Sequence, residues 1–196
     1  MSKAIFLDRD GTLNEEMGYI NHPRRFRVFP FTAESIRIFN QLGYLVVVVT
    51  NQSGVARGYF SESLLKQVHS KLISDMKMEH ARIDAIFYCP HLPGSGNSPF
   101  SIDCNCRKPK PGMLRRAAEE FQIDLENSVG IGDRYKDVVF AKENGLLSAM
   151  VMTGYGQGEY EYQRSEWSLF PDLVGETLLD VAQQIQDGHI DTIHRK

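Results

Sequence analysis

The stretch YLVVVVT, residues 44–50, constrains the possible fold of this chain more than any other segment. Its four consecutive valines form a β-branched run, without the alternation of apolar and polar residues that marks a strand with one face in water. Such continuous runs are typical of strands that are buried on both faces of a parallel sheet. Because parallel strands need crossover connections, which are usually helices, the run predicts an α/β protein.

Strand patterns and helix patterns alternate along the rest of the 196 residues. Further strands are predicted at residues 4–7, 85–88, 128–133 and 147–152. Helices are predicted over residues 32–42, from Ser61 onward, from Pro111 onward, over 136–144 and over 175–186. This order predicts a three-layer α/β/α sandwich around a mostly parallel, Rossmann-like sheet. No internal repeat or long linker divides the chain, so we expect one domain over residues 1–196.

The composition excludes several classes of protein. A net charge of −3 argues against a protein that coats nucleic acid or binds a membrane surface. The N-terminal segment MSKAIFLDRDGT is too poor in apolar residues for a signal peptide. No later run approaches the ~20 apolar residues of a membrane helix, so we expect a cytoplasmic protein. The three cysteines, an odd number, argue against a disulfide framework.

Polar residues follow the predicted strands at the point where each strand ends. Asp8 and Asp10 follow the first strand, Thr50 ends the second, and Asp133 ends the fourth. Lys108 lies between the third strand and the fourth. Because ligands bind beyond the carboxyl ends of parallel strands, we expect these side chains at one edge of the sheet. Asp8 and Asp133 would form a cluster of hard oxygen ligands suited to Mg²⁺.

This set of residues predicts phosphoryl transfer. With magnesium offsetting the charge of a phosphate dianion, Asp8 can attack phosphorus and form an aspartyl phosphate. Asp10 can protonate the leaving oxygen and then take a proton from the water that cleaves the intermediate. Thr50 can donate a hydrogen bond, and Lys108 a positive charge, to the transferring group. Each residue alone has an ordinary structural explanation, but their joint occurrence in this order favours a catalytic site.

All three cysteines lie with a histidine in one irregular loop, residues 89–106. Two pairs separated by twelve residues supply the four ligands that a closed tetrahedral zinc site needs: Cys89, His91, Cys104 and Cys106. The alternative is a set of buried cysteines beside a surface histidine, but the glycine, proline and serine between them offer no apolar face. With all four positions taken by protein, the zinc would be structural, and it would fix the adjacent Arg107 and Lys108.

Four motifs, in this order, resemble those of the haloacid dehalogenase (HAD) superfamily of phosphatases: DRDGT at 8–12, TNQSG at 50–54, RKPKPG at 107–112 and GDRYKD at 132–137. Within that superfamily the chain resembles the D-glycero-D-manno-heptose 1,7-bisphosphate phosphatases. The runs that carry this narrower resemblance are GYI at 18–20, TNQSGVARGYF at 50–60 and CPH…CNCRKPKPGML at 89–114. The resemblance implies a HAD-like fold and removal of the 7-phosphate of the heptose bisphosphate, a step in making nucleotide-activated heptose.

The resemblance also implies roles for single residues. It implies Asp8 as nucleophile, Asp10 as general acid and base, and Mg²⁺ held by Asp8, Asp133 and the backbone carbonyl of Asp10. It implies zinc in the cysteine loop, phosphoryl contacts from Thr50, Asn51 and Lys108, and substrate recognition by Arg107. The further residues that we expect to bind substrate are Arg9, Gly18, Tyr19, Gln52, Ser53, Arg57 and Arg134.

Many superfamily members carry a separate cap domain, but the gaps between these motifs leave no room for one. Specificity must therefore come from loops, and a bisphosphate would use loop arginines for its non-reacting phosphate. We expect a small-molecule sugar bisphosphate as substrate, no nucleic-acid or membrane partner, and a monomer. The sequence leaves the preference between the α and β anomers open.

Three alternatives compete with this interpretation. A histidinol-phosphate phosphatase has a similar zinc loop, although TNQSGVARG favours the heptose group, since histidinol enzymes tend to read TNQDG. A phosphoacceptor receiver module also places an aspartate, a hydroxyl and a lysine around Mg²⁺, but it lacks an acid like Asp10 two residues beyond the nucleophile. A zinc-stabilised interaction module with a vestigial site is disfavoured by the intact acids and lysine.

Overall fold

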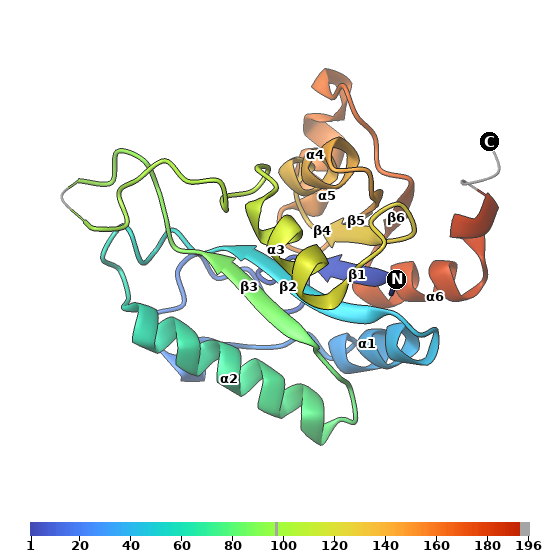
Figure 1. Ribbon diagram of the computed structural model, residues 1–196, viewed down its shortest axis with the longest axis horizontal. Coiled ribbons are helices and arrows are strands. Elements are labelled where there is room, and N and C mark those ends of the chain that lie inside the picture. The colour runs from blue at the N-terminus through green and yellow to red at the C-terminus, as the bar shows by residue number, and fades with distance from the viewer. Residues whose placement is uncertain (97, 193–196) are drawn as a thin grey trace.

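A six-stranded parallel sheet runs through the centre of the computed structural model, which describes residues 1–96 and 98–192 (Figure 1). The strand order is β3-β2-β1-β4-β5-β6, and every neighbouring pair is parallel. The strands are β1 (Ala4–Leu7), β2 (Leu45–Asn51), β3 (Ala85–Cys89), β4 (Val129–Gly132), β5 (Leu147–Val151) and β6 (Leu173–Gly175). The predicted α/β class with a parallel sheet is confirmed.

Helices cover both faces of the sheet (Figure 1). One face packs against α1 (Thr32–Gln41), α2 (Glu62–Met78) and α6 (Leu178–Gln186). The other face packs against α3 (Gly112–Phe121) and α4 (Tyr135–Glu143), with α5 (Gly156–Tyr162) beside α4. Three short 3-10 helices complete the described elements: Pro23–Arg25, Arg164–Glu166 and His189–Thr192. No helix in the described part of the chain combines the length and apolar character needed to cross a membrane.

The valine run of β2 shows why the sheet is buried on both faces. Val46 and Val48 belong to the apolar core under α1, α2 and α6, whereas Val47 and Val49 belong to the core under α3 and α4. All four side chains are buried. Successive side chains of a strand point to opposite faces, so a continuous apolar run serves two cores at once.

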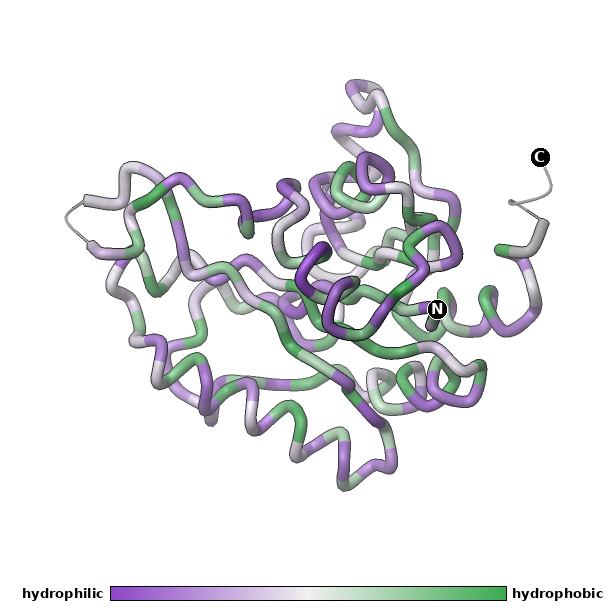
Figure 2. The backbone as a smooth tube through the Cα atoms, viewed as in Figure 1, coloured by the Kyte–Doolittle hydropathy of each residue, from purple (hydrophilic) through white to green (hydrophobic). Residues whose placement is uncertain are grey.

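The long helix α2 begins where the sequence predicts. Ser61 is its N-cap, and its side chain accepts a hydrogen bond from the backbone N–H of Leu64 at 3.1 Å. The helix buries Leu65, Val68 and Leu72 and leaves the residues between them polar, a pattern that Figure 2 shows as alternating green and purple along the tube.

The C-terminal part of the chain differs from the prediction. The helix predicted from residue 175 begins instead at Leu178, because Thr177 and Asp180 form a capping box at its N-terminus. Gly175 ends the sixth strand, which the sequence does not predict because three residues carry too little pattern. The glycine-rich segment after β5 also contains an unpredicted helix, α5.

The chain order creates a switch point between β1 and β4. These strands are neighbours in the middle of the sheet, and the connections from them run to opposite edges. The backbone N–H of Asp8 donates to the carbonyl of Ile131 at 2.9 Å, which continues the ladder past the last residue of β1. A crevice at such a switch point is where open α/β sheets bind ligands.

Candidate active site

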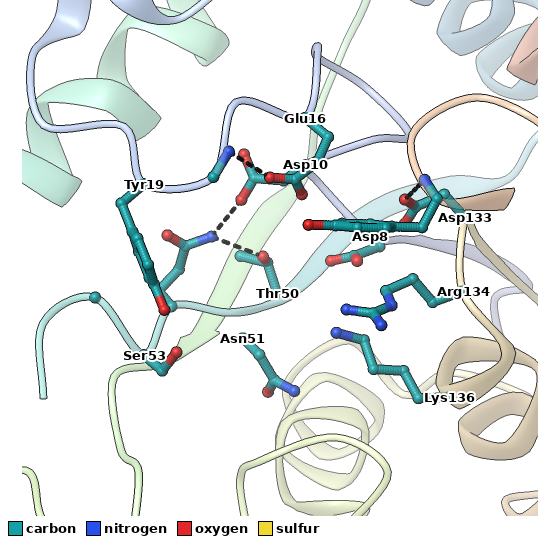
Figure 3. A pocket seen from close by; sticks show the side chains of 14 residues that line it. Asp8, Asp10, Glu16, Tyr19, Thr50, Asn51, Ser53, Asp133, Arg134 and Lys136 are labelled. Carbon is teal, nitrogen blue, oxygen red and sulfur yellow. Dashed lines mark hydrogen bonds between the residues drawn. The ribbon is translucent and has the colours of Figure 1, made fainter. Parts of the chain in front are cut away.

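Three buried carboxylates gather at the carboxyl ends of the two central strands, and Figure 3 shows two of them, Asp8 and Asp133. Asp8 follows β1, Asp133 follows β4, and Asp137 lies in the first turn of α4. One carboxylate oxygen from each lies within 4.8 Å of the others. The structure thus brings Asp8 and Asp133 together, as predicted, and adds Asp137 from the GDRYKD motif.

Lys108 offsets part of this negative charge. Its Nζ atom lies 3.0 Å from Oδ1 of Asp8 and 2.7 Å from Oδ1 of Asp137. Burial favours the neutral amine, but the two carboxylates outweigh it and raise the pKa of Lys108. Burial likewise acts to raise the pKa of Asp8, and the charge of Lys108 prevails and lowers it. Both groups are therefore ionised at neutral pH.

Lys108 pairs with Asp8 and Asp137 but not with Asp133. Burial, with the charges of Asp8 and Asp137, raises the pKa of Asp133 to about 8. In the described part of the chain, Oδ1 of Asp133 and Oδ2 of Asp137 are buried without a hydrogen-bond partner. Hard carboxylate oxygens without partners, close together and mutually repelling, fit a divalent cation such as Mg²⁺.

Asp10 is held from three sides beside this cluster. Gln52 donates from Nε2 to Oδ2 of Asp10 at 2.8 Å, and also to Oγ1 of Thr50 at 3.0 Å (Figure 3). Asn14 donates to Oδ1 of Asp10 at 2.9 Å. Arg9 donates to both carboxylate oxygens from Nη2, at 2.8 and 2.6 Å. Charge-assisted donors on both oxygens fix the plane of the carboxylate.

A cleft opens above these residues. The predicted site residues that line it are Asp8, Asp10, Gly18, Tyr19, Thr50, Asn51, Gln52, Ser53, Asp133 and Arg134. Figure 3 shows Tyr19 and Ser53 on one side of this cleft and Arg134 and Lys136 on the other.

Four of the predicted catalytic and substrate-binding residues do not line the cleft. Lys108 lies beneath its floor on Asp8, and Arg9 is buried with its guanidinium on Asp10. Arg57 is exposed in the segment after β2. Arg107 is half-buried and donates from Nη1 to the carbonyl of His91 at 3.2 Å. The positions of Arg9 and Arg107 are thus set by protein contacts.

Four further residues line the cleft and were not predicted as site residues from the sequence: Glu16, Gly54, Lys136 and Tyr155. Glu16 accepts a hydrogen bond from the N–H of Gly18 at 2.6 Å, and burial and the charge of Asp10 raise its pKa. Lys136 lies within the GDRYKD motif, so the motif itself was a signal for it. Glu16 lies between the DRDGT motif and GYI, but no spacing rule marks it.

Arg134 is held at the rim by the C-terminal part of the chain. Its Nε donates to Oε1 of Glu159 at 2.7 Å, and its guanidinium carbon lies 4.4 Å from the centre of the Tyr155 ring. Glu159, which is buried, also accepts from the N–H of Tyr135 at 2.6 Å. Arg134 therefore presents a positioned cation to the cleft.

The four predicted zinc ligands form a second cluster at the end of β3. The sulfur atoms of the three cysteines lie 3.2 to 3.5 Å apart, and Nδ1 of His91 lies 3.2 Å from Sγ of Cys106 and 3.7 Å from Sγ of Cys89. One nitrogen and three sulfur atoms at these separations fit the corners of a tetrahedron around a soft or borderline metal ion. Cys104 and Cys106 also pack against the core under α3. The arrangement is a candidate metal centre that joins this loop to the domain.

The fold and the acid cluster at its switch point are those of a HAD-like hydrolase that acts on phosphoric monoesters. The family model described as HAD-hydrolase-like matches residues 105–181. The D-glycero-beta-D-manno-heptose-1,7-bisphosphate 7-phosphatase of Haemophilus influenzae is 40% identical over 168 residues, covering 83% of this chain and 91% of that protein. The enzyme of the same name from Pasteurella multocida is 44% identical over 155 residues, covering 79% and 84%.

A solved structure agrees with these relatives. The D,D-heptose 1,7-bisphosphate phosphatase of B. bronchiseptica, complexed with magnesium and phosphate, superposes with a TM-score of 0.82 at 33% identity and covers 95% of this chain and 99% of that one. The chain belongs to the D-glycero-D-manno-heptose-1,7-bisphosphate 7-phosphatase family. The resemblance that the motifs indicate is thereby confirmed.

Proposed function

We propose that the protein removes the 7-phosphate of D-glycero-D-manno-heptose 1,7-bisphosphate by way of a phosphorylated Asp8. The observation that carries this proposal is the position of Asp8, at the switch point of the sheet, between Lys108 and the acid pair Asp133 and Asp137. Carboxylates that form acyl phosphates need a neighbouring cation and a separate acid and base, and this site supplies candidates for both.

In the first step an oxygen of Asp8 attacks phosphorus while the bond between phosphorus and the sugar oxygen breaks. Asp10, as the acid, gives its proton to that oxygen, so the sugar leaves as a neutral alcohol. Thr50 donates its hydroxyl hydrogen to the transferring group. Lys108 keeps Asp8 ionised and fixes the attacking carboxylate.

In the second step water attacks the phosphorus of the aspartyl phosphate. Asp10, now the base, takes a proton from that water, and the bond between phosphorus and the Asp8 oxygen breaks. The products are inorganic phosphate and the free carboxylate of Asp8. Asp10 ends the cycle protonated, ready for the next substrate.

Mg²⁺ is the proposed catalytic cation, held by Asp8, Asp133 and the backbone carbonyl of Asp10. When bound, it offsets the charge of the phosphate dianion and of the three buried acids. Asp137 supports the site through Lys108. The partnerless Oδ1 of Asp133 supports this assignment.

Zn²⁺ is the proposed ion of the second cluster, held by Cys89, His91, Cys104 and Cys106. Its role is structural, since all four positions of a tetrahedral ion are filled by protein. Arg107 and Lys108 follow Cys106 directly, so the ion would fix the backbone that delivers Lys108 to Asp8.

Substrate selection is assigned to the loops around the cleft. We propose that Arg134 and Lys136 attract the non-reacting phosphate and that Tyr19 and Ser53 contact the sugar, because these residues line opposite sides of the cleft. Arg57 and Arg107 remain proposed contacts for a substrate that extends beyond the cleft. We further propose a single-domain, cytoplasmic monomer.

The test is phosphate release with Mg²⁺ from a panel of both anomers of the heptose bisphosphate, histidinol phosphate and a short 3′-phosphorylated oligonucleotide. Asp8→Asn is the inactive control, and Asp187→Asn, an exposed position, is the matched control. We expect a preference of at least ~10²-fold in kcat/KM for one heptose anomer, lost in Asp8→Asn. Activity on histidinol phosphate alone would overturn the substrate, and release from none of them would favour a phosphoacceptor module.

A further inference from the structure

Arg9, like the acids and the lysine of the site, is a charged side chain that is almost fully buried. It is 2% exposed, and it lies between the nucleophile Asp8 and the acid Asp10 in the chain. Burying a guanidinium is costly unless the charge is paired and its donors are satisfied. Its contacts therefore indicate what this buried charge does.

The first contact of Arg9 is with Asp10. Nη2 lies 2.8 and 2.6 Å from the two oxygens of that carboxylate, and Nε lies 3.2 Å from Oδ1. The fork of the guanidinium thus matches the carboxylate through two nitrogens, which fixes both its direction and its plane. The Asp10 side chain is 18% exposed, so its oxygens still reach the cleft.

The second contact of Arg9 is with His69, which comes from α2. Nη1 of Arg9 lies 3.2 Å from Nε2 of His69, and the histidine is 7% exposed. Burial and the charge of Arg9 lower the pKa of His69 to about 3, so the ring is neutral and Nε2 accepts the hydrogen bond. The ring centre of Tyr88 lies 5.4 Å from that of His69, and the ring of Phe26 lies 5.8 Å from the guanidinium carbon.

We infer that Arg9 and His69 are positioning residues for Asp10: His69 holds Arg9, and Arg9 holds the carboxylate that gives and takes the proton. This inference rests on the proposed role of Asp10. Arg9 does not line the cleft, so this positioning role replaces the substrate contact that the sequence predicts for Arg9. A carboxylate that must act on the leaving oxygen and then on water gains from a fixed orientation in both steps.

The test compares two leaving groups. An alkyl phosphate, such as the sugar phosphate that the wild type hydrolyses fastest, needs a proton on its leaving oxygen, whereas p-nitrophenyl phosphate does not. The value of kcat/KM reports the steps up to the formation of the aspartyl phosphate, and not the later hydrolysis of that intermediate. In Arg9→Met we expect kcat/KM to fall ~10²-fold for the alkyl phosphate and less than ~3-fold for the aryl phosphate.

A double-mutant cycle separates positioning from general damage. If Arg9 acts through Asp10, adding Arg9→Met to Asp10→Asn should lower kcat/KM for the alkyl phosphate by less than ~3-fold further. Two results would overturn the inference. One is a double variant in which the losses of kcat/KM from Arg9→Met and Asp10→Asn multiply, and the other is an equal loss for the alkyl and the aryl phosphate in Arg9→Met. Failure of the heptose panel leaves this comparison intact, since it needs only a hydrolysable alkyl phosphate.

His69 offers a milder test if Arg9→Met does not fold. His69→Gln keeps an acceptor near the position of Nε2, whereas His69→Phe keeps the ring volume and removes the acceptor. We expect His69→Gln to stay within ~3-fold of the wild type and His69→Phe to lose ~10-fold on the alkyl phosphate alone. His80→Gln, an exposed position, is the control. Equal activity of His69→Gln and His69→Phe on the alkyl phosphate would show that His69 does not position Arg9.

Discussion

The side-chain amide of Asn51 is hydrogen bonded to both backbone polar groups of Lys108. Its Oδ1 accepts from the N–H of Lys108 at 3.0 Å, and its Nδ2 donates to the carbonyl of Lys108 at 3.1 Å. The end of β2 therefore holds the segment that follows the cysteine cluster. Lys108 is fixed through its backbone by Asn51 and through its side chain by Asp8 and Asp137.

Asn51→Ala should release this backbone and lower activity. Because Lys108 would no longer be held against Asp8, we expect kcat/KM to fall by ~10- to 100-fold, with a loss of about 1 to 3 kcal/mol in the free energy of unfolding. Steady-state kinetics and denaturant unfolding would measure the two effects. Asn127→Ala, which removes an exposed amide, is the control. Unchanged kinetics in Asn51→Ala would contradict this role.

Gly154→Ala should damage the proposed cation site from the C-terminal side. Gly154 has φ +58°, and a Cβ there would overlap with Oδ2 of Asp133 and crowd the Cα of Gly11. We expect a loss of Mg²⁺ affinity of at least ~10-fold by calorimetric titration, because the whole carboxylate of Asp133, including the proposed ligand oxygen Oδ1, must move. Gly158→Ala, where a Cβ would meet nothing within 4 Å, should bind Mg²⁺ as the wild type does. Equal affinity in the two variants would show that Asp133 is not displaced.

The sequence predicts this site well where local pattern and function coincide. Asp8 and Thr50 follow apolar strand runs, and a strand end at the edge of a parallel sheet already indicates where a side chain lies. The role of Arg9 was not predictable in this way, since its partner His69 lies 60 residues away on a helix. β6, with three residues, was missed because its pairing with β5, and not its own pattern, makes it a strand.

Loss of the proposed zinc should lower both stability and activity. In Cys106→Ser we expect the zinc content to fall from about one ion per chain to near zero and the unfolding temperature to fall by roughly 10 °C. Activity with Mg²⁺ should fall as well, because Lys108 lies two residues after the lost ligand. Metal analysis and thermal unfolding measure this, with Ser101→Ala in the same loop as the control. A wild-type protein purified without zinc and indifferent to a strong zinc chelator would refute the assignment.

The buried His69 should make the protein sensitive to acid. Its pKa falls from 6.5 to about 3 on folding, mainly through burial, so below pH 6.5 the unfolded chain binds a proton that the native state does not. The free energy of unfolding therefore decreases as the pH falls from 6.5 toward 3. At pH 4.5 this single group should lower the free energy of unfolding by about 2 to 3 kcal/mol.

His69→Gln removes this titration, so its free energy of unfolding should rise relative to that of the wild type as the pH falls from 7.5 to 4.5. The difference between the two proteins, measured by denaturant unfolding at each pH, isolates His69 from the carboxylates that titrate in both. His80→Gln, which removes an exposed histidine, is the control for the loss of an imidazole as such. A difference between wild type and His69→Gln that stays constant with pH would mean that His69 has the same pKa in the native state as in the unfolded chain. An imidazole that is buried against the guanidinium of Arg9 could not keep an ordinary pKa, so this outcome would contradict the contact through which His69 holds Arg9.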